Sequence, residues 1–120
     1  MNISFQALQP DYVDYLRDES RLTGNAEQIA FPREEQEVRE LLAASSGSPV
    51  TIQGARTGIC GGAVPQGGVV LNLSRMNRVL ALEQGPQRGE FRLRVQPGVL
   101  LSELNDWLAK RELPAAGWHA

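Results

Sequence analysis

The residues best suited to bind a ligand lie together in one glycine-rich segment, residues 53–63, with the sequence QGARTGICGGA. Four glycines and two alanines among these eleven residues leave the backbone almost without side chains. Residues 49–52 before the segment and residues 69–73 after it are rich in β-branched and apolar types, which predicts a strand on each side. A glycine-rich loop between two strands can turn several successive N–H groups toward one point, where they suit phosphate oxygens. We therefore predict that this loop binds a phosphate-bearing ligand.

Two other phosphate-binding motifs do not fit the segment. A nucleotide-hydrolysing P-loop needs a Lys and a Ser or Thr after its last glycine, at the start of a helix, whereas Gly58 is followed by Ile59 and Cys60. The dinucleotide motif G-x-G-x-x-G needs a strand-to-helix turn, and no helical period follows here. The alternative to a binding site is a flexible surface loop without function.

The remaining elements predict an α+β fold. Apolar residues at helical spacing favour helices over residues 10–21, 34–44 and 100–111. Residues 79–83 and 91–95 are predicted to be strands joined by the turn residues 85–89, which makes them a hairpin. In the second hairpin strand, Arg92 and Arg94 alternate with apolar residues, so we expect them on a solvent-exposed face.

The glycine-rich segment is one of several motifs that follow one another along the chain. They are residues 18–21 (DESR), 30–32 (AFP), 53–58 (QGARTG), 61–65 (GGAVP), 68–77 (GVVLNLSRMN) and 95–99 (VQPGV). In this order they resemble the flavin-binding domain of the vanillyl-alcohol oxidase / p-cresol methylhydroxylase (PCMH) superfamily, and most of all its glycolate oxidase and D-lactate dehydrogenase branch. The resemblance implies the N-terminal α/β subdomain of a PCMH-type FAD-binding domain, a small mixed sheet flanked by helices. Residues 1–31 would be a helical lead-in, and residues 32–120 the first part of the domain.

The resemblance also implies the cofactor and the residues that hold it. FAD would place its diphosphate against the backbone N–H groups of residues 54–58, and residues 61–62 would continue the contact toward the flavin. Arg56 stands where the family usually has a further glycine; its guanidinium could pair with a phosphate or point to solvent, and a positive φ there would strain it. The expected cofactor-binding residues are Gln53, Gly54, Ala55, Arg56, Thr57, Gly58, Gly61 and Gly62.

Thr57 bears on how the cofactor is attached. In the relatives with a covalently tethered flavin, a histidine occupies the position of Thr57. Threonine cannot form that bond, so we expect FAD to be bound non-covalently. The Thr57 hydroxyl could instead donate to a phosphate or bond to its own backbone.

The composition excludes several other classes of partner. Hydrophobic residues make up 42% and charged residues 22% of the chain, the net charge is −2, and there is no basic stripe, so we expect no nucleic-acid partner. No apolar run approaches the ~20 residues that span a bilayer, and the N-terminus lacks a signal-peptide pattern, so we expect a cytoplasmic protein without a membrane span. Cys60, the only cysteine, is expected to be small and buried, and His119, the only histidine, to be inert.

The resemblance implies a function for the larger protein rather than for this chain alone. It is that of an FAD-dependent oxidoreductase in which a hydride passes from the α-carbon of a D-2-hydroxy acid, such as glycolate or D-lactate, to flavin N5. The family supplies its base, metal ligands and substrate arginines from later segments, so we assign no catalytic and no metal-binding residue here. We expect an N-terminal fragment that is inactive alone and that, through exposed apolar surface, forms homo-oligomers or is poorly soluble. The alternative is a non-catalytic module that binds nucleotide weakly and completes an assembly.

Overall fold

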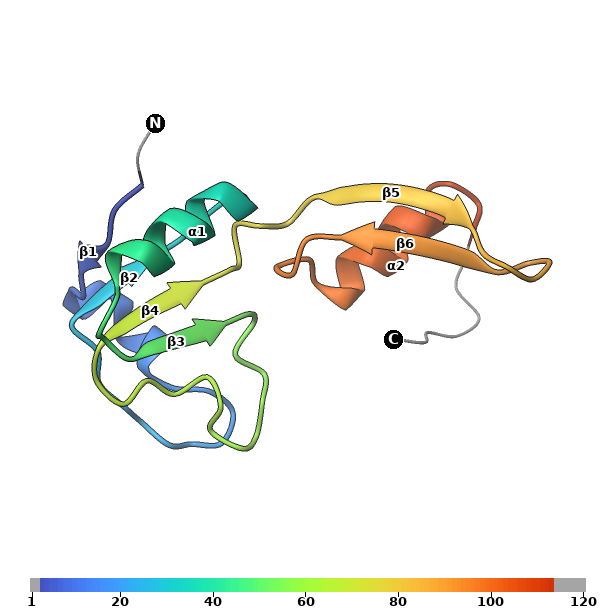
Figure 1. The fold of residues 1–120 in the computed structure, drawn as a ribbon. Coiled ribbons are helices and arrows are strands. Elements are labelled where there is room, and N and C mark those ends of the chain that lie inside the picture. The colour runs from blue at the N-terminus through green and yellow to red at the C-terminus, as the bar shows by residue number, and fades with distance from the viewer. Residues whose placement is uncertain (1–2, 114–120) are drawn as a thin grey trace.

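The computed structural model describes residues 3–113, which form two separate sheets with helices packed beside them (Figure 1). The larger sheet has four strands in the order β1-β2-β4-β3, and the smaller one is the hairpin of β5 and β6. The strands are β1 (Gln6–Ala7), β2 (Gln28–Ala30), β3 (Val50–Gln53), β4 (Val69–Asn72), β5 (Val79–Gln84) and β6 (Phe91–Val95). Strands β2, β4 and β3 run parallel, whereas β1 is antiparallel to β2. The small mixed sheet confirms the predicted α+β class.

Helical elements cover both faces of the larger sheet. They are the 3-10 helix η1 (Pro10–Leu16) and the α-helix α1 (Glu35–Ala44), while α2 (Leu101–Ala109) belongs to the hairpin half (Figure 1). On the η1 face, Ile29 and Val70 pack with Tyr12 and Tyr15. On the opposite face, Leu71 packs with Leu41 of α1. Side chains on a strand point alternately to the two faces, so consecutive residues of β4 supply both cores and the whole strand is buried.

The predicted elements agree with the observed ones to within a few residues, with two exceptions. Strands β1 and β2 were not predicted, and β2 lies in the middle of the sheet although it falls in the stretch expected to be a lead-in. The helix expected over residues 10–21 is the shorter 3-10 helix η1, which begins at Pro10 and has non-helical dihedral angles at Tyr12. These three segments take their conformation from pairing with the sheet or packing on it rather than from their local sequence pattern.

The hairpin half is attached to the larger sheet by a short linker after β4. The Gln96 side chain accepts a hydrogen bond from the backbone N–H of Arg78 (2.9 Å) and donates one to the carbonyl of Arg33 (3.2 Å), just before α1. Gly98 donates its N–H to the carbonyl of Met76 (2.8 Å). These contacts join the end of β6 to the segment that follows β4.

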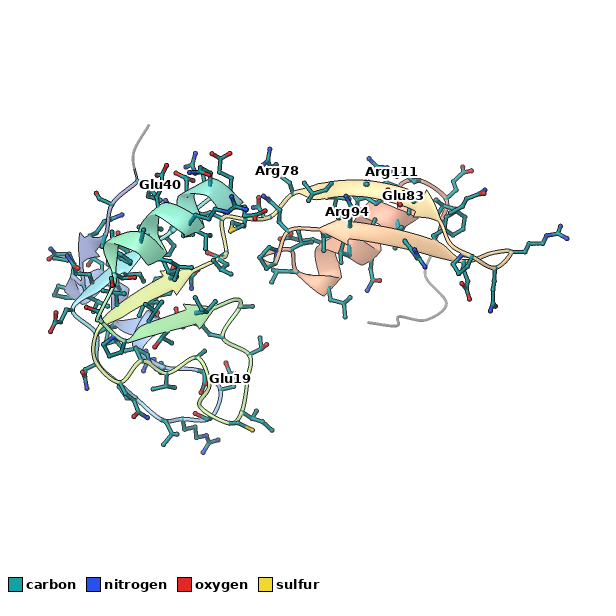
Figure 2. The ribbon with its side chains drawn as sticks, in the orientation of Figure 1. Glu19, Glu40, Arg78, Glu83, Arg94 and Arg111 are labelled. Atoms are coloured by element: carbon teal, nitrogen blue, oxygen red, sulfur yellow. The ribbon has the colours of Figure 1, made fainter. Side chains whose placement is uncertain are left out.

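Charged side chains on the hairpin face solvent, as expected. Glu83 on β5 and Arg94 on β6 project away from the strands, and Arg78 lies on the linker between the two halves (Figure 2). The guanidinium of Arg111 stacks over the half-buried Trp107 ring at 3.5 Å.

Within residues 3–113, no helix has the length and apolar character needed to cross a membrane. His119 lies outside the described residues.

Candidate cofactor-binding site

The glycine-rich segment forms an exposed loop that leaves the carboxyl end of β3 and returns beside the segment after η1 (Figure 1). Two isolated bridges order that segment, one between Arg17 and Thr23 and one between Asn25 and Gln66, which follows the loop. In sheets of parallel strands, ligands bind near the carboxyl ends of the strands. The loop therefore lies where such a sheet commonly holds a ligand.

The loop presents a run of backbone N–H groups without acceptors. From Gly54 to Cys60, no N–H donates a hydrogen bond to another group in the described part of the chain. The residues of this run are exposed, apart from the half-buried Arg56. Backbone N–H groups seek acceptors, and successive N–H groups in an irregular segment suit an anion. The loop can thus supply several donors to one phosphate-bearing ligand.

Some glycines of this chain are required by the fold itself. A Cβ atom at Gly24 would lie 1.8 Å from the carbonyl oxygen of Pro65, and one at Gly98 would lie 2.1 Å from that of Leu73. Such distances leave no room for a side chain, because non-bonded carbon and oxygen atoms do not approach so closely. At these positions the neighbouring backbone explains the glycine.

The glycines of the loop are different. A Cβ at Gly54 or Gly62 would meet no atom within 4 Å, and one at Gly58 would meet only the Asp18 carboxylate at 3.9 Å. None of the three has a positive φ. The fold therefore does not require glycine at these positions, whereas a ligand that closely approaches the backbone would. The contrast shows where the fold leaves the backbone of the loop open to a ligand.

A buried amide pair fixes the start of the loop. The Gln53 side chain, only 1% exposed, donates to the carbonyls of Tyr15 (2.6 Å) and Ala63 (2.8 Å) and accepts a hydrogen bond from Asn72 (3.0 Å). The Asn72 side chain in turn accepts the N–H of Ser74 (3.0 Å). Of the expected site residues, Gln53 thus has its side chain inside the fold, where it ties the loop to the end of η1.

Arg56 makes a contact that the sequence did not suggest. Its guanidinium donates to the backbone carbonyls of Asp14 and Arg17 and stacks 4.8 Å from the centre of the Tyr15 ring. Its φ of 57° lies in the left-handed region, which favours glycine. Arg56 therefore joins the loop to the end of η1 at the expense of backbone strain.

The two effects at Arg56 can be separated by substitution. Arg56→Gly removes the contacts and the strain together, whereas Arg56→Ala removes the contacts but keeps the strain. We expect Arg56→Ala to be less stable than Arg56→Gly by about 1 kcal/mol in denaturant unfolding. If the alanine variant is as stable as the glycine variant, residue 56 is not held at positive φ.

The tip of the loop is open to solvent. Thr57 and Cys60 are exposed, and Ile59 is 77% exposed. The expectation that Cys60 is buried was wrong, because no segment within residues 3–113 covers the tip. Gly61 has a φ of 81°, and its Cβ position lies 3.0 Å from the Leu22 side chain, so this glycine, unlike Gly62, has a structural reason.

A cavity of about 460 Å³ lies between the loop and the segment after η1. The loop contributes small or positively charged side chains, and the segment contributes acids and arginines. The lining residues are Asp14, Arg17, Asp18, Glu19, Arg21, Thr23, Ala55 and Arg56. Of these, only Ala55 and Arg56 were among the expected site residues. Asp18 is the buried member of the others, and the sequence does not show its burial because it depends on how the loop folds.

Two carboxylates near the loop have shifted pKa values. Hydrogen bonding to Arg17, together with its positive charge, lowers the pKa of the exposed Asp14. The pKa of Asp18 is lowered by hydrogen bonds from Ser20 in the first place, with the N–H groups of Ala63 and Gly61 adding to the effect against the cost of burial. Both side chains are therefore carboxylates at neutral pH.

Residues 26–116 match a protein family described as an FAD binding domain. This chain belongs to that family. It is similar to an uncharacterized FAD-linked oxidoreductase of Mycobacterium tuberculosis strain H37Rv, with 40% identity over 98 residues, which cover 77% of this chain and 20% of that protein. It is also similar to a D-lactate dehydrogenase of Anaerostipes hadrus, with 38% identity over 96 residues, which cover 76% of this chain and 19% of that protein. The chain spans about a fifth of the length of these curated relatives.

The fold has a counterpart among solved structures. The crystal structure of p-cresol methylhydroxylase with substrate bound superposes with a TM-score of 0.72, covering 90% of this chain and 22% of that one at 19% identity. This match confirms the predicted fold, that of the FAD-binding domain of the PCMH superfamily. FAD is accordingly the ligand of this family of domains, and a loop with free N–H groups and unobstructed glycines fits its diphosphate.

Proposed function

We propose that the loop from Gly54 to Gly62 holds the diphosphate of FAD in a flavin oxidoreductase that oxidises D-2-hydroxy acids. The contrast between the glycines is the observation that places FAD at this loop in the proposal. A Cβ atom added at Gly54 or Gly62 would meet nothing within 4 Å, and one added at Gly58 would meet only the Asp18 carboxylate, at 3.9 Å. The similarity to a D-lactate dehydrogenase supports the substrate class.

The residues of this domain would bind and orient the cofactor. FAD, when bound, supplies the chemistry of hydride acceptance, and the protein positions its reactive ring against the substrate. The free N–H groups of the loop would stabilise the negative diphosphate, and the Gln53–Asn72 pair would fix the loop from below. The remainder of the site for substrate would come from other parts of the protein.

The substrate class can be tested on the full-length gene product loaded with FAD. Anaerobic addition of D-lactate or glycolate is expected to bleach the flavin absorbance near its visible maximum, while L-lactate leaves it oxidised. A flavin that is bleached by no 2-hydroxy acid but is still retained on gel filtration would favour a non-catalytic nucleotide-binding module instead.

We further propose that the FAD is held without a covalent bond, because the loop offers Thr57 where covalent relatives have histidine. Acid denaturation of the flavin-loaded gene product is expected to release all of the flavin into the supernatant. A yellow protein pellet would contradict this proposal and would point to a covalent attachment elsewhere in the protein.

A further inference from the structure

Asp18 is a buried carboxylate without a cationic partner. Its residue is 9% exposed, and neither of the ion pairs within residues 3–113 includes it. One of its oxygens, Oδ1, accepts the N–H of Ser20 at 2.8 Å. The other, Oδ2, is buried and has no partner at hydrogen-bond geometry among the described residues. Burying a charge in this way is costly unless nearby dipoles compensate for it.

Compensation comes first from Ser20 and then from the glycine-rich loop. An added Cβ at Gly58 would lie 3.9 Å from Oδ2, and one at Gly61 would lie 3.8 Å from the hydroxyl oxygen of Ser20, so the segment that holds Asp18 lies against the returning half of the loop. The N–H groups of Ala63 and Gly61 help to lower the pKa of the Asp18 carboxylate. Within residues 3–113, the N–H groups of residues 54–60 donate to no backbone carbonyl and are left for a ligand.

We propose that Asp18 is a positioning residue for FAD, whose carboxylate holds the returning half of the loop so that the preceding N–H groups face the diphosphate. This inference rests on the proposed role of the loop. A negative charge such as that of Asp18 disfavours an anionic ligand nearby, so the carboxylate needs another role in this site. The charge stabilises the loop conformation instead of attracting the ligand.

Asp18→Asn tests the proposal, because two explanations predict opposite signs. If the charge acted only through its field, its removal would tighten the binding of an anionic ligand. If the carboxylate positions the loop, the Asn amide presents N–H donors toward the N–H groups of Gly61 and Ala63, and binding weakens. We expect the FAD dissociation constant of the full-length gene product, measured by flavin fluorescence, to rise about tenfold or more, the factor that one charge-assisted hydrogen bond provides.

Asp106→Asn is the matched control. Asp106 is an exposed acid on α2, in the hairpin half, and it does not line the cavity beside the loop. This substitution removes the same charge without touching the loop, so we expect the FAD dissociation constant to stay within about twofold, as for surface charges in general. Equal effects of the two substitutions would overturn the proposal.

Amide hydrogen exchange provides a readout that does not depend on FAD. The N–H groups of Gly61 and Ala63 are expected to exchange faster in Asp18→Asn than in the wild type, while those of β4 keep their protection. Unchanged exchange at both positions, or FAD binding as tight as in the wild type or tighter, would overturn the proposal.

Should Asp18→Asn not fold, Ser20→Ala decides the question. It keeps the carboxylate and removes the Ser20 hydroxyl, which accepts the N–H of Leu22 (3.2 Å) and is the largest cause of the lowered pKa of Asp18, so we expect a smaller loss, with a dissociation constant raised about threefold. No change in this variant would overturn the proposal. Loss of FAD in Gly58→Val alongside normal FAD binding in the Asp18 and Ser20 variants would reject the role of Asp18 while leaving the loop as the site.

Discussion

Gly54→Val and Gly58→Val are each expected to abolish FAD binding while leaving the fold intact. The Cβ position of Gly54 has no neighbour within 4 Å, and that of Gly58 has only the Asp18 carboxylate at 3.9 Å, so the fold leaves room for a Cβ atom at both positions. A valine there keeps the diphosphate away from the N–H groups. Loss of two charge-assisted hydrogen bonds corresponds to a dissociation constant raised at least about a hundredfold, measured by fluorescence titration of the gene product.

Ser46→Val is the control for these variants. Ser46 is exposed in the turn after α1, at the opposite end of β3 from the loop. We expect its FAD affinity and its circular dichroism spectrum to match those of the wild type. Normal flavin content in both glycine variants would remove the loop from the binding site, and unfolding of both would mean that the fold, not the ligand, requires these glycines.

Gly68→Ala is expected to have the opposite effect and to destabilise the fold itself. Gly68 has a φ of 68°, and a Cβ there would lie 2.1 Å from the carbonyl oxygen of Pro49. Its own carbonyl accepts the N–H of Glu27 (2.8 Å), so the backbone cannot move away without losing that bond. Strain and overlap together are expected to lower the free energy of unfolding by about 3 kcal/mol or more.

Gly89→Ala separates strain from overlap. Gly89 also has a positive φ, 82°, but a Cβ there would meet nothing within 4 Å. We expect a loss of only about 1 kcal/mol in urea unfolding, from the left-handed backbone alone. Equal losses at positions 68 and 89 would show that the Pro49 carbonyl does not limit the space at Gly68.

Sequence patterns predicted the parts of the fold whose conformation is local. The β-branched and apolar residues of β3 and β4, the alternation in β6 and the helical spacing in α1 are all visible in the chain itself. By contrast, β2 has only three residues, too few to show a period, and it is a strand because it pairs with β4. The 3-10 helix η1 is similarly shaped by the packing of Tyr12 and Tyr15 on Phe31.

The candidate site shows the same division. The glycine-rich loop was visible from its composition, but the sequence does not show which glycines are required by neighbouring backbone and which are not. The burial of Gln53 against Asn72 follows from the register of β3 on β4, in which these two residues are partners. The contacts of Arg56 and Asp18 join segments about 40 residues apart, so only the folded chain reveals them.

The crystal structure of the full-length gene product with FAD bound tests the central claim most directly. We expect diphosphate oxygens within about 3.2 Å of backbone nitrogens between Gly54 and Cys60, the range of N–H···O hydrogen bonds. A diphosphate bound elsewhere, with these N–H groups turned to solvent or to protein acceptors, would contradict it.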